Sequence, residues 1–218
     1  FPYQTLGWGP LLPYSLGVAV IPGVLVLGER LAARRPGGPR GGRVVCALLL
    51  GVALTGAWAL HPSAALSVAI PLVVQAVAGI VAAPGRRARL AVAGGFGLAA
   101  LVASVYALWS LSVIGSAEPD ADFAWPRHMG VGRAVAGVFD LGPSALASAG
   151  ITVLVLIGLA AAVTHAPWRR PLAAMVVALA GYGTLYVLAA GVREDWVRMF
   201  TGFWWDDMYR FSALLALP

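Results

Sequence analysis

Six long apolar stretches dominate this 218-residue chain, and nearly all of its charged residues lie between them. A helix needs about 20 mainly apolar residues to cross the hydrocarbon core of a bilayer, and each stretch approaches or exceeds that length. The pattern therefore predicts an all-α, polytopic transmembrane bundle with about six spans. The predicted spans are Leu11–Leu27, Val44–Leu60, Ser63–Ala83, Leu90–Ile114, Ser144–Val163 and Leu172–Val192.

The composition excludes a water-soluble globule. Hydrophobic residues make up 60% of the chain and charged residues 11%, whereas a soluble domain carries about 25% charged residues. All 15 basic side chains are arginines, and the abundance of Ala, Gly, Val and Leu is typical of a GC-rich genome such as an actinobacterium's. The arginines lie between apolar runs rather than along a stripe, so we expect contact with the lipid bilayer and not with nucleic acid.

The charge balance alternates from one connection to the next. Three connections together hold ten of the 15 arginines and one of the nine acidic residues; they are 28–43, 84–89 and 164–171. The loops 115–143 and 193–210 hold the other five arginines and the other eight acids. The positive-inside rule places the basic connections in the cytoplasm. Residues 1–10, His61-Pro62 and both acidic loops then face outside, as in a multi-pass protein of the plasma (inner) membrane.

Proline and polar residues refine the spans. Pro62 follows His61 and breaks helical geometry, which predicts a tight hairpin between the second and third spans. No span carries an ionisable residue near mid-membrane, where Gln75 is the most polar side chain. Ion-coupled carriers usually need such residues, so the pattern argues against a proton-coupled carrier. We expect Cys46 to be a small core residue, and the run Gly94–Gly97 to mark close helix packing.

The most distinctive segment is 193–210, which gathers acids, arginines and aromatic residues before a new apolar run. Paired carboxylates can act as a general base or hold a divalent cation. Arginine offers a two-pronged donor for phosphate, and aromatic faces suit sugar rings or polyprenyl chains. The candidate catalytic residues are Asp207 and Asp206, and the candidate substrate-binding residues are Arg210, Arg198, Trp204, Trp205 and, from the outer hairpin, His61.

Structural roles explain the same residues and stay open beside the functional ones. Asp206 or Asp207 would also cap a helix that begins near Met208. Their spacing to Arg210 also suits an ordinary helix-surface ion pair, and the tryptophans suit an interfacial belt. His61 is either a polar hairpin residue or a contact to a phosphate or hydroxyl group.

The loop 115–143 is long for a simple connection, and such loops are often functional. Its later part, Val131–Leu141, mixes apolar and charged residues and predicts a short interfacial or re-entrant helix. Asp120, Asp122 and His128 could gather around a metal ion, but nothing fixes their spacing, so no metal site is predicted. The cofactor is unknown; a divalent cation would suit the carboxylates but is not indicated.

The chain is expected to be an internal fragment of a longer membrane protein, with 1–218 forming a single membrane-embedded region. Residue 1 is Phe, and no basic segment followed by a short apolar core precedes the first span. The apolar run that starts at Phe211 is too short to cross a bilayer.

Three patches resemble a large actinobacterial family of polytopic membrane proteins of unknown function. The first combines Phe1-Pro2-Tyr3, Trp8-Gly9, Pro13-Tyr14 and Leu16-Gly17; the others are His61-Pro62 and Trp204–Ala213. In that family the last patch commonly reads Trp-Tyr-Asn-Asp-x-x-Arg. Asp207 and Arg210 match this pattern, whereas Trp205 stands where Tyr is usual and Asp206 where Asn is usual.

Members of this family resemble glycosyltransferases of the GT-C class, which take sugars from polyprenyl-phosphate carriers at the outer membrane face. The resemblance implies a GT-C-like fold and a polyprenyl-phosphate-linked sugar as partner, in cell-envelope assembly. The class keeps its key acidic residue in a first outer loop that this chain does not contain. Two other functions stay open: a transporter or flippase of lipid-linked saccharides, and a non-catalytic membrane scaffold.

Overall fold

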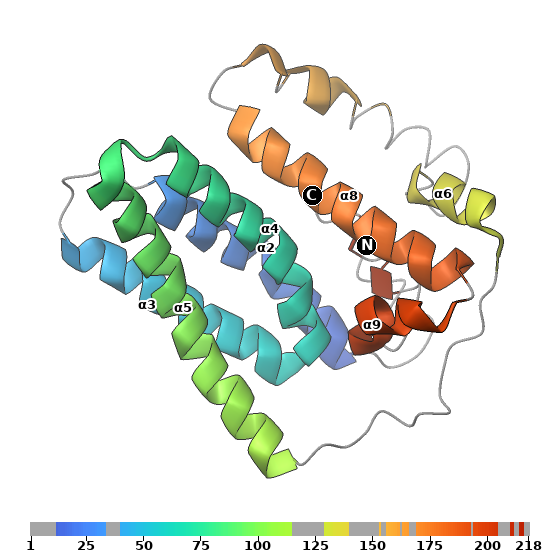
Figure 1. The fold of residues 1–218 in the computed structure, drawn as a ribbon, viewed down its shortest axis with the longest axis horizontal. Coiled ribbons are helices and arrows are strands. Elements are labelled where there is room, and N and C mark those ends of the chain that lie inside the picture. Colours follow the sequence, from blue (N-terminus) through green and yellow to red (C-terminus); the bar gives the residue numbers. More distant parts are fainter. Residues whose placement is uncertain are drawn as a thin grey trace. The chain divides into compact units, whose positions relative to one another are not determined.

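The protein is all-α. A computed structural model describes residues 12–33, 40–114, 129–139, 153, 156–161, 163–165, 169–192, 194–204, 210–211 and 214–215. Every regular element in these ranges is helical, as predicted (Figure 1). The elements are α2 (Leu12–Ala33), α3 (Arg40–Leu60), α4 (Pro62–Ala82), α5 (Gly85–Ile114), α6 (Val131–Phe139), α8 (Arg169–Gly191), the 3-10 turn η2 (Asp195–Val197), α9 (Arg198–Thr201) and the 3-10 turn η3 (Gly202–Trp204).

The chain divides into two compact units. The first, here the α2–α5 unit, comprises Pro10–Glu118, and the second, here the α6–α9 unit, comprises Phe1–Gly9 with Pro119–Pro218. In the first unit α3 contacts α2, α4 and α5, and α4 contacts α2 and α5. In the second unit the main contact between described helices joins α6 to α8.

Four helices are long and apolar enough to cross a membrane, so the chain has the features of a multi-pass membrane protein. These candidate spans are Leu16–Ala33, Gly41–Leu60, Pro62–Ala82 and Gly85–Val113. They match the first four predicted spans. A shorter apolar helical stretch, Val176–Gly191, lies where the last span is predicted. Most of the predicted fifth span, Ser144–Val163, lies outside the described residues.

The helices run past the predicted spans wherever an arginine stands near a helix end. α2 continues to Ala33 rather than stopping at Leu27, α3 begins at Arg40, and α5 begins at Gly85 rather than Leu90. The loss of hydropathy marks where a span leaves the hydrocarbon core, but it does not end the helix. Arg, Ala and Leu are strong helix formers, so the helices extend into the polar zone.

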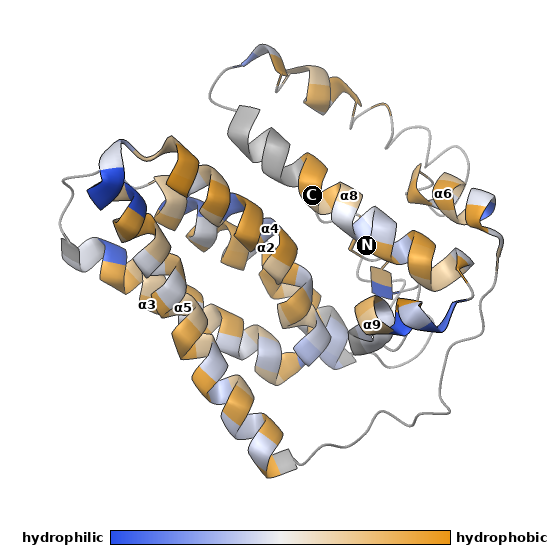
Figure 2. Cartoon of the chain, in the orientation of Figure 1, coloured by the Kyte–Doolittle hydropathy of each residue, from blue (hydrophilic) through white to orange (hydrophobic). Residues whose placement is uncertain are grey.

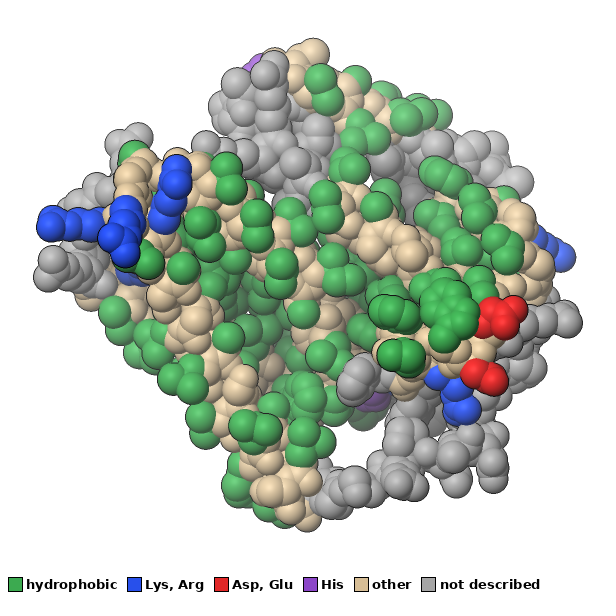
Figure 3. Space-filling view, in the orientation of Figure 1, with side chains coloured by type: hydrophobic (Ala, Val, Ile, Leu, Met, Phe, Trp, Pro, Cys, Tyr) green, Lys and Arg blue, Asp and Glu red, His purple; other side chains and the backbone are tan. Residues whose placement is uncertain are grey.

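The surface of the α2–α5 unit is arranged for lipid rather than water. Large apolar side chains along its helices are exposed, among them Val52, Val73, Val81, Leu101 and Leu108. The helices are apolar over most of their length (Figure 2), and basic side chains gather at the end where α4 meets α5 (Figure 3). Contiguous exposed apolar surface of this extent is rare on soluble monomers. The bilayer explains both the apolar sides and the charged end.

Small residues sit where the helices of this unit touch. A Cβ added at Gly17 would lie 2.6 Å from Ala64 Cβ, and one at Gly51 would lie 2.7 Å from Val102 Cβ. One at Gly79 would lie 2.9 Å from Ala32 Cβ. Helices in lipid associate through close backbone approach, which small residues permit. These glycines therefore hold α2 against α4 and α3 against α5, and they bring Ala32 of α2 close to α4.

The prediction for the run Gly94–Gly97 is correct only in part. A Cβ on Gly95 would lie 2.9 Å from Leu31 Cδ1, so this glycine does allow close packing on α2. Gly94 and Gly97 have nothing within 4 Å of an added Cβ. Successive residues of a helix point in different directions, so a run of neighbouring glycines cannot all face one partner.

Polar side chains inside this unit bond to backbone carbonyls of α2. Cys46 is buried, as predicted, and its Sγ donates to Leu27 O at 3.6 Å. Gln75 Nε2 donates to Leu25 O at 3.2 Å, which ties the middle of α4 to α2. Gln75 Oε1 is buried, and no donor among the described residues reaches it. Gly28 leaves the room for this oxygen, because a Cβ there would collide with it.

Replacing Gly51 by alanine is expected to destabilise the protein by about 1–3 kcal/mol, the usual cost of overpacking. Its Cβ would meet Val102 Cβ at 2.7 Å and Ala99 O at 3.0 Å. Gly56 lies on the same helix with nothing within 4 Å of an added Cβ. Gly56→Ala is therefore the matched control, expected to be neutral or slightly stabilising. Thermal unfolding in detergent measures both, and equal effects would show that α3 and α5 are not in close contact.

Candidate functional site

His61 forms the one-residue link between α3 and α4. Its backbone is extended, with φ −164° and ψ 123°, and Pro62 stands at the first helical position of α4. The ring Nδ1 accepts a hydrogen bond from Ser63 N at 3.3 Å and lies 2.7 Å from Ser63 Oγ. His61 is thus the N-cap of α4, and the predicted tight hairpin is confirmed.

Buried polar groups surround this hairpin. The Tyr14 ring meets the His61 ring edge-on, with centroids 5.4 Å apart and an interplanar angle of 82°. Ser63 and Ser67 are fully buried, and Ser67 Oγ donates to Ser63 O at 2.6 Å. His61 itself is half-buried. The hairpin therefore presents one partly accessible imidazole, held by both α2 and α4, at the end of the unit opposite the arginines.

Arg210 lies in the α6–α9 unit and is almost completely enclosed, with 2% of its surface exposed. Trp204 is 6% exposed, and its ring packs on the fully buried Phe211 with centroids 5.1 Å apart. A guanidinium keeps its charge at all accessible pH values. Its burial is favourable only where acceptors or an anion surround it. Among the described residues Arg210 is therefore the buried cation, and it lies next in the chain to the Trp204–Phe211 ring pair.

Arg198, by contrast, is exposed on α9. It shares this surface with the acidic Glu194 and Asp195 and with the half-exposed Trp196 and Phe200, whose rings lie 6.0 Å apart. Figure 3 shows acidic side chains beside a hydrophobic patch near α9. Such mixtures of charged and aromatic residues are typical of the membrane interface. The two arginines grouped by sequence thus have different environments, and only Arg210 is buried.

Several predicted site residues lie outside the described residues. These are Asp206, Asp207 and Trp205, together with the possible metal ligands Asp120, Asp122 and His128. The alternative roles of Asp206 and Asp207 as helix caps or ion-pair partners of Arg210 lie there too. Among the residues that the structure does describe, no group of three His, Cys, Asp or Glu side chains could hold a metal ion.

Sequence reasoning missed the residues that support the site. Ser63 and Ser67 are four residues apart and share one helix face, as do Tyr182 and Tyr186, which are buried in α8. A Cβ on Gly137 would lie 2.9 Å from the Tyr186 hydroxyl oxygen, so α6 packs closely on α8 at this tyrosine. The spacing of four residues between these polar side chains, within otherwise apolar helices, is the sequence signal that identifies them. The predicted helix within 131–141 is confirmed as α6.

His61→Asn separates the structural role of this residue from a functional one. Asparagine is among the best N-cap residues, so this variant should keep the stability of the wild type. His61→Ala should lose about 0.5–2 kcal/mol, the usual cost of removing a cap. Thermal unfolding of both variants checks the cap. An alanine variant as stable as the wild type would contradict it, and an asparagine variant that is stable but inactive would assign the imidazole a further role.

One protein family matches the chain. The sequence model described as Family of unknown function (DUF6541) matches residues 1–218. No curated protein and no solved structure matches the chain significantly. The match agrees with the predicted resemblance to a membrane family of unknown function.

Proposed function

The chain belongs to the DUF6541 family of unknown function, and from its own residues we propose that it is a glycosyltransferase-like protein of the membrane. It acts at the extracytoplasmic face on sugars linked to a lipid phosphate, in cell-envelope assembly. The observation that carries the proposal is the almost completely buried Arg210, whose chain neighbour Phe211 packs on the ring of Trp204. A buried guanidinium near aromatic surface is suited to a phosphate that carries a sugar or an isoprenoid.

The proposed reaction is transfer of a sugar to an acceptor hydroxyl. The acceptor oxygen attacks the anomeric carbon, the bond from that carbon to the phosphate oxygen breaks, and the lipid phosphate leaves with the bonding electrons. Asp207 takes the proton of the acceptor hydroxyl as general base. Asp206 is the second carboxylate, and Arg210 neutralises the leaving phosphate. If the base lies in a loop outside this chain, Asp207 binds the substrate instead.

The remaining candidates are assigned to contacts with the substrate. Trp204 and Trp205 line the path of the sugar or lipid, Arg198 attracts the phosphate from the exposed surface, and His61 contacts a hydroxyl or phosphate group. These assignments rest on residue chemistry and on the predicted outer location of 193–210 and the hairpin. No cofactor is assigned.

We also propose a six-span topology of GT-C type. The first four spans are the candidate spans of the α2–α5 unit. The fifth and sixth are Ser144–Val163 and Leu172–Val192. The arginine-rich connections 28–43, 84–89 and 164–171 then lie in the cytoplasm of a cell with a plasma (inner) membrane. The exposed Arg86, Arg87 and Arg89 at the junction of α4 and α5 support this orientation.

Asp207→Asn should lower sugar transfer at least 100-fold, because removing a general base typically costs that factor or more. Asp195→Asn, at an exposed position of η2, is the matched control and should leave transfer unchanged. The assay follows radiolabelled sugar from polyprenyl phosphate to acceptor with full-length protein in liposomes. Unchanged transfer by Asp207→Asn would remove that residue from the mechanism. If the wild-type protein moves the intact lipid-linked sugar across the membrane without transferring the sugar, it is a flippase. If it shows neither activity, it is a scaffold.

Arg210→Lys keeps the positive charge but loses the two-pronged geometry. We expect a tenfold or greater rise in KM for the lipid-phosphate donor. Arg133→Lys, at an exposed position of α6, should leave KM unchanged. Thermal unfolding first establishes that both variants fold. A folded Arg210→Lys variant with the KM of the wild type would contradict phosphate binding by this residue.

A further inference from the structure

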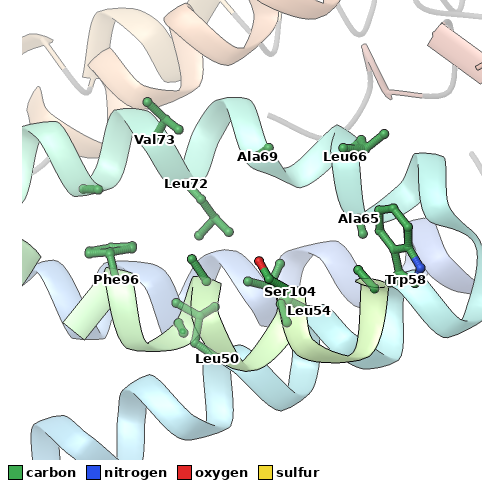
Figure 4. A pocket seen from close by; sticks show the side chains of 15 residues that line it. Leu50, Leu54, Trp58, Ala65, Leu66, Ala69, Leu72, Val73, Phe96 and Ser104 are labelled. Atoms are coloured by element: carbon green, nitrogen blue, oxygen red, sulfur yellow. The ribbon is translucent and has the colours of Figure 1, made fainter. Parts of the chain in front are cut away.

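An apolar groove runs along the α2–α5 unit between α4 and α5, with α3 as its floor (Figure 4). Its volume is about 380 Å³, within the range of about 300–1,000 Å³ that is typical of small-molecule sites. Of its 15 lining residues, Ser104 and Trp58 are the only two with polar side-chain groups. The others are Ala, Leu, Val and Phe.

The groove is long. On α4 its lining runs from Ala65 to Ala76, and on α5 from Phe96 to Ala107. At about 1.5 Å per residue, each wall is about 16 Å long, which is about half of the roughly 30 Å thickness of a bilayer's hydrocarbon core. Phe96 lies at one end and Trp58 at the other (Figure 4).

In the orientation proposed above, the Trp58 end of the groove faces the outer leaflet. Trp58 lies two residues before the end of α3, next to the His61 hairpin, and the arginines lie at the opposite end of the unit. The indole N–H of Trp58 donates to Ser110 Oγ at 3.1 Å, which fixes its ring between α3 and α5. Tryptophan is enriched at the level of the lipid headgroups. The groove thus extends from the outer headgroup level to about the middle of the membrane.

The lining selects an apolar and slender occupant. Water and polar solutes would find almost no hydrogen-bond partners along these walls. Val73 lines the groove and is 61% exposed, and Leu101 and Leu108 of α5, outside the lining, are also more than 60% exposed. Such large side chains oppose the close helix approach that small residues permit.

We propose that this groove binds one acyl chain of an outer-leaflet phospholipid. The chain lies along the alanines of α4 and α5, with its headgroup near Trp58 and its end near Phe96. The matching length, the apolar lining and the position in one leaflet carry this inference. It does not depend on the proposed glycosyl transfer, since a flippase or a scaffold would hold the lipid equally well.

Photolabelling of the full-length protein in nanodiscs tests the proposal. The probe is a phosphatidylglycerol with a diazirine in one acyl chain, and mass spectrometry maps the labelled residues. We expect labels to concentrate on groove residues such as Ala69, Ala100 and Ala103. Labelling spread evenly over all lipid-facing residues would overturn the proposal. Labelling of the lipid-facing residues outside the groove, with none in the groove, would overturn it too. Displacement of the label by equimolar polyprenyl phosphate would overturn the choice of a phospholipid.

A filled groove provides the second measurement. Ala103→Phe places a ring within the groove and should lower groove labelling at least tenfold. Ala93→Phe makes the same change at an exposed position of α5 outside the groove, and should leave labelling unchanged. Equal labelling of both folded variants would contradict the proposal. If Ala103→Phe does not fold, the labelling map of the wild type decides. Sugar transfer measured in parallel is expected to report separately on the proposed function.

Discussion

Close backbone contact at small residues is the interaction on which the α2–α5 unit depends. Lipid is as apolar as the side chains, so the hydrophobic effect does not press transmembrane helices together. Packing at Gly17, Gly51 and Gly79 takes its place. At each of these glycines the partner helix lies so close that an added Cβ would collide with it. The hairpin, the buried Gln75 and the apolar groove all lie between helices whose spacing these contacts set.

The His61 end of the same unit combines tight backbone geometry with polar chemistry. A single residue, His61, joins two helices, caps the second and packs against Tyr14 of a third. Buried serines bond along the helix below it. Most polar groups in lipid are costly, so a cluster of them at one helix end indicates contact with water or with the polar part of a ligand. That end is also where the proposed lipid headgroup lies.

The buried Arg210 poses a different physical problem in the α6–α9 unit. A permanent charge with 2% exposure needs surrounding acceptors, whereas Arg198 is exposed at the surface. Sequence spacing grouped both arginines as phosphate ligands, since it registers charge but not burial. The tertiary structure separates them, and this separation makes Arg210 the centre of the proposed site.

The sequence by itself determined the all-α class, four candidate spans, the hairpin at His61 and the clustering of arginines at one end of the α2–α5 unit. These follow from local quantities, because the transfer free energy of a segment depends on its own residues. Tertiary structure alone decided that Gly95 but not Gly94 packs on α2, that Arg210 is buried, and that alanines of α4 and α5 line one groove. The rotation of each helix about its axis sets these features, and that rotation depends on contacts between residues far apart in the chain.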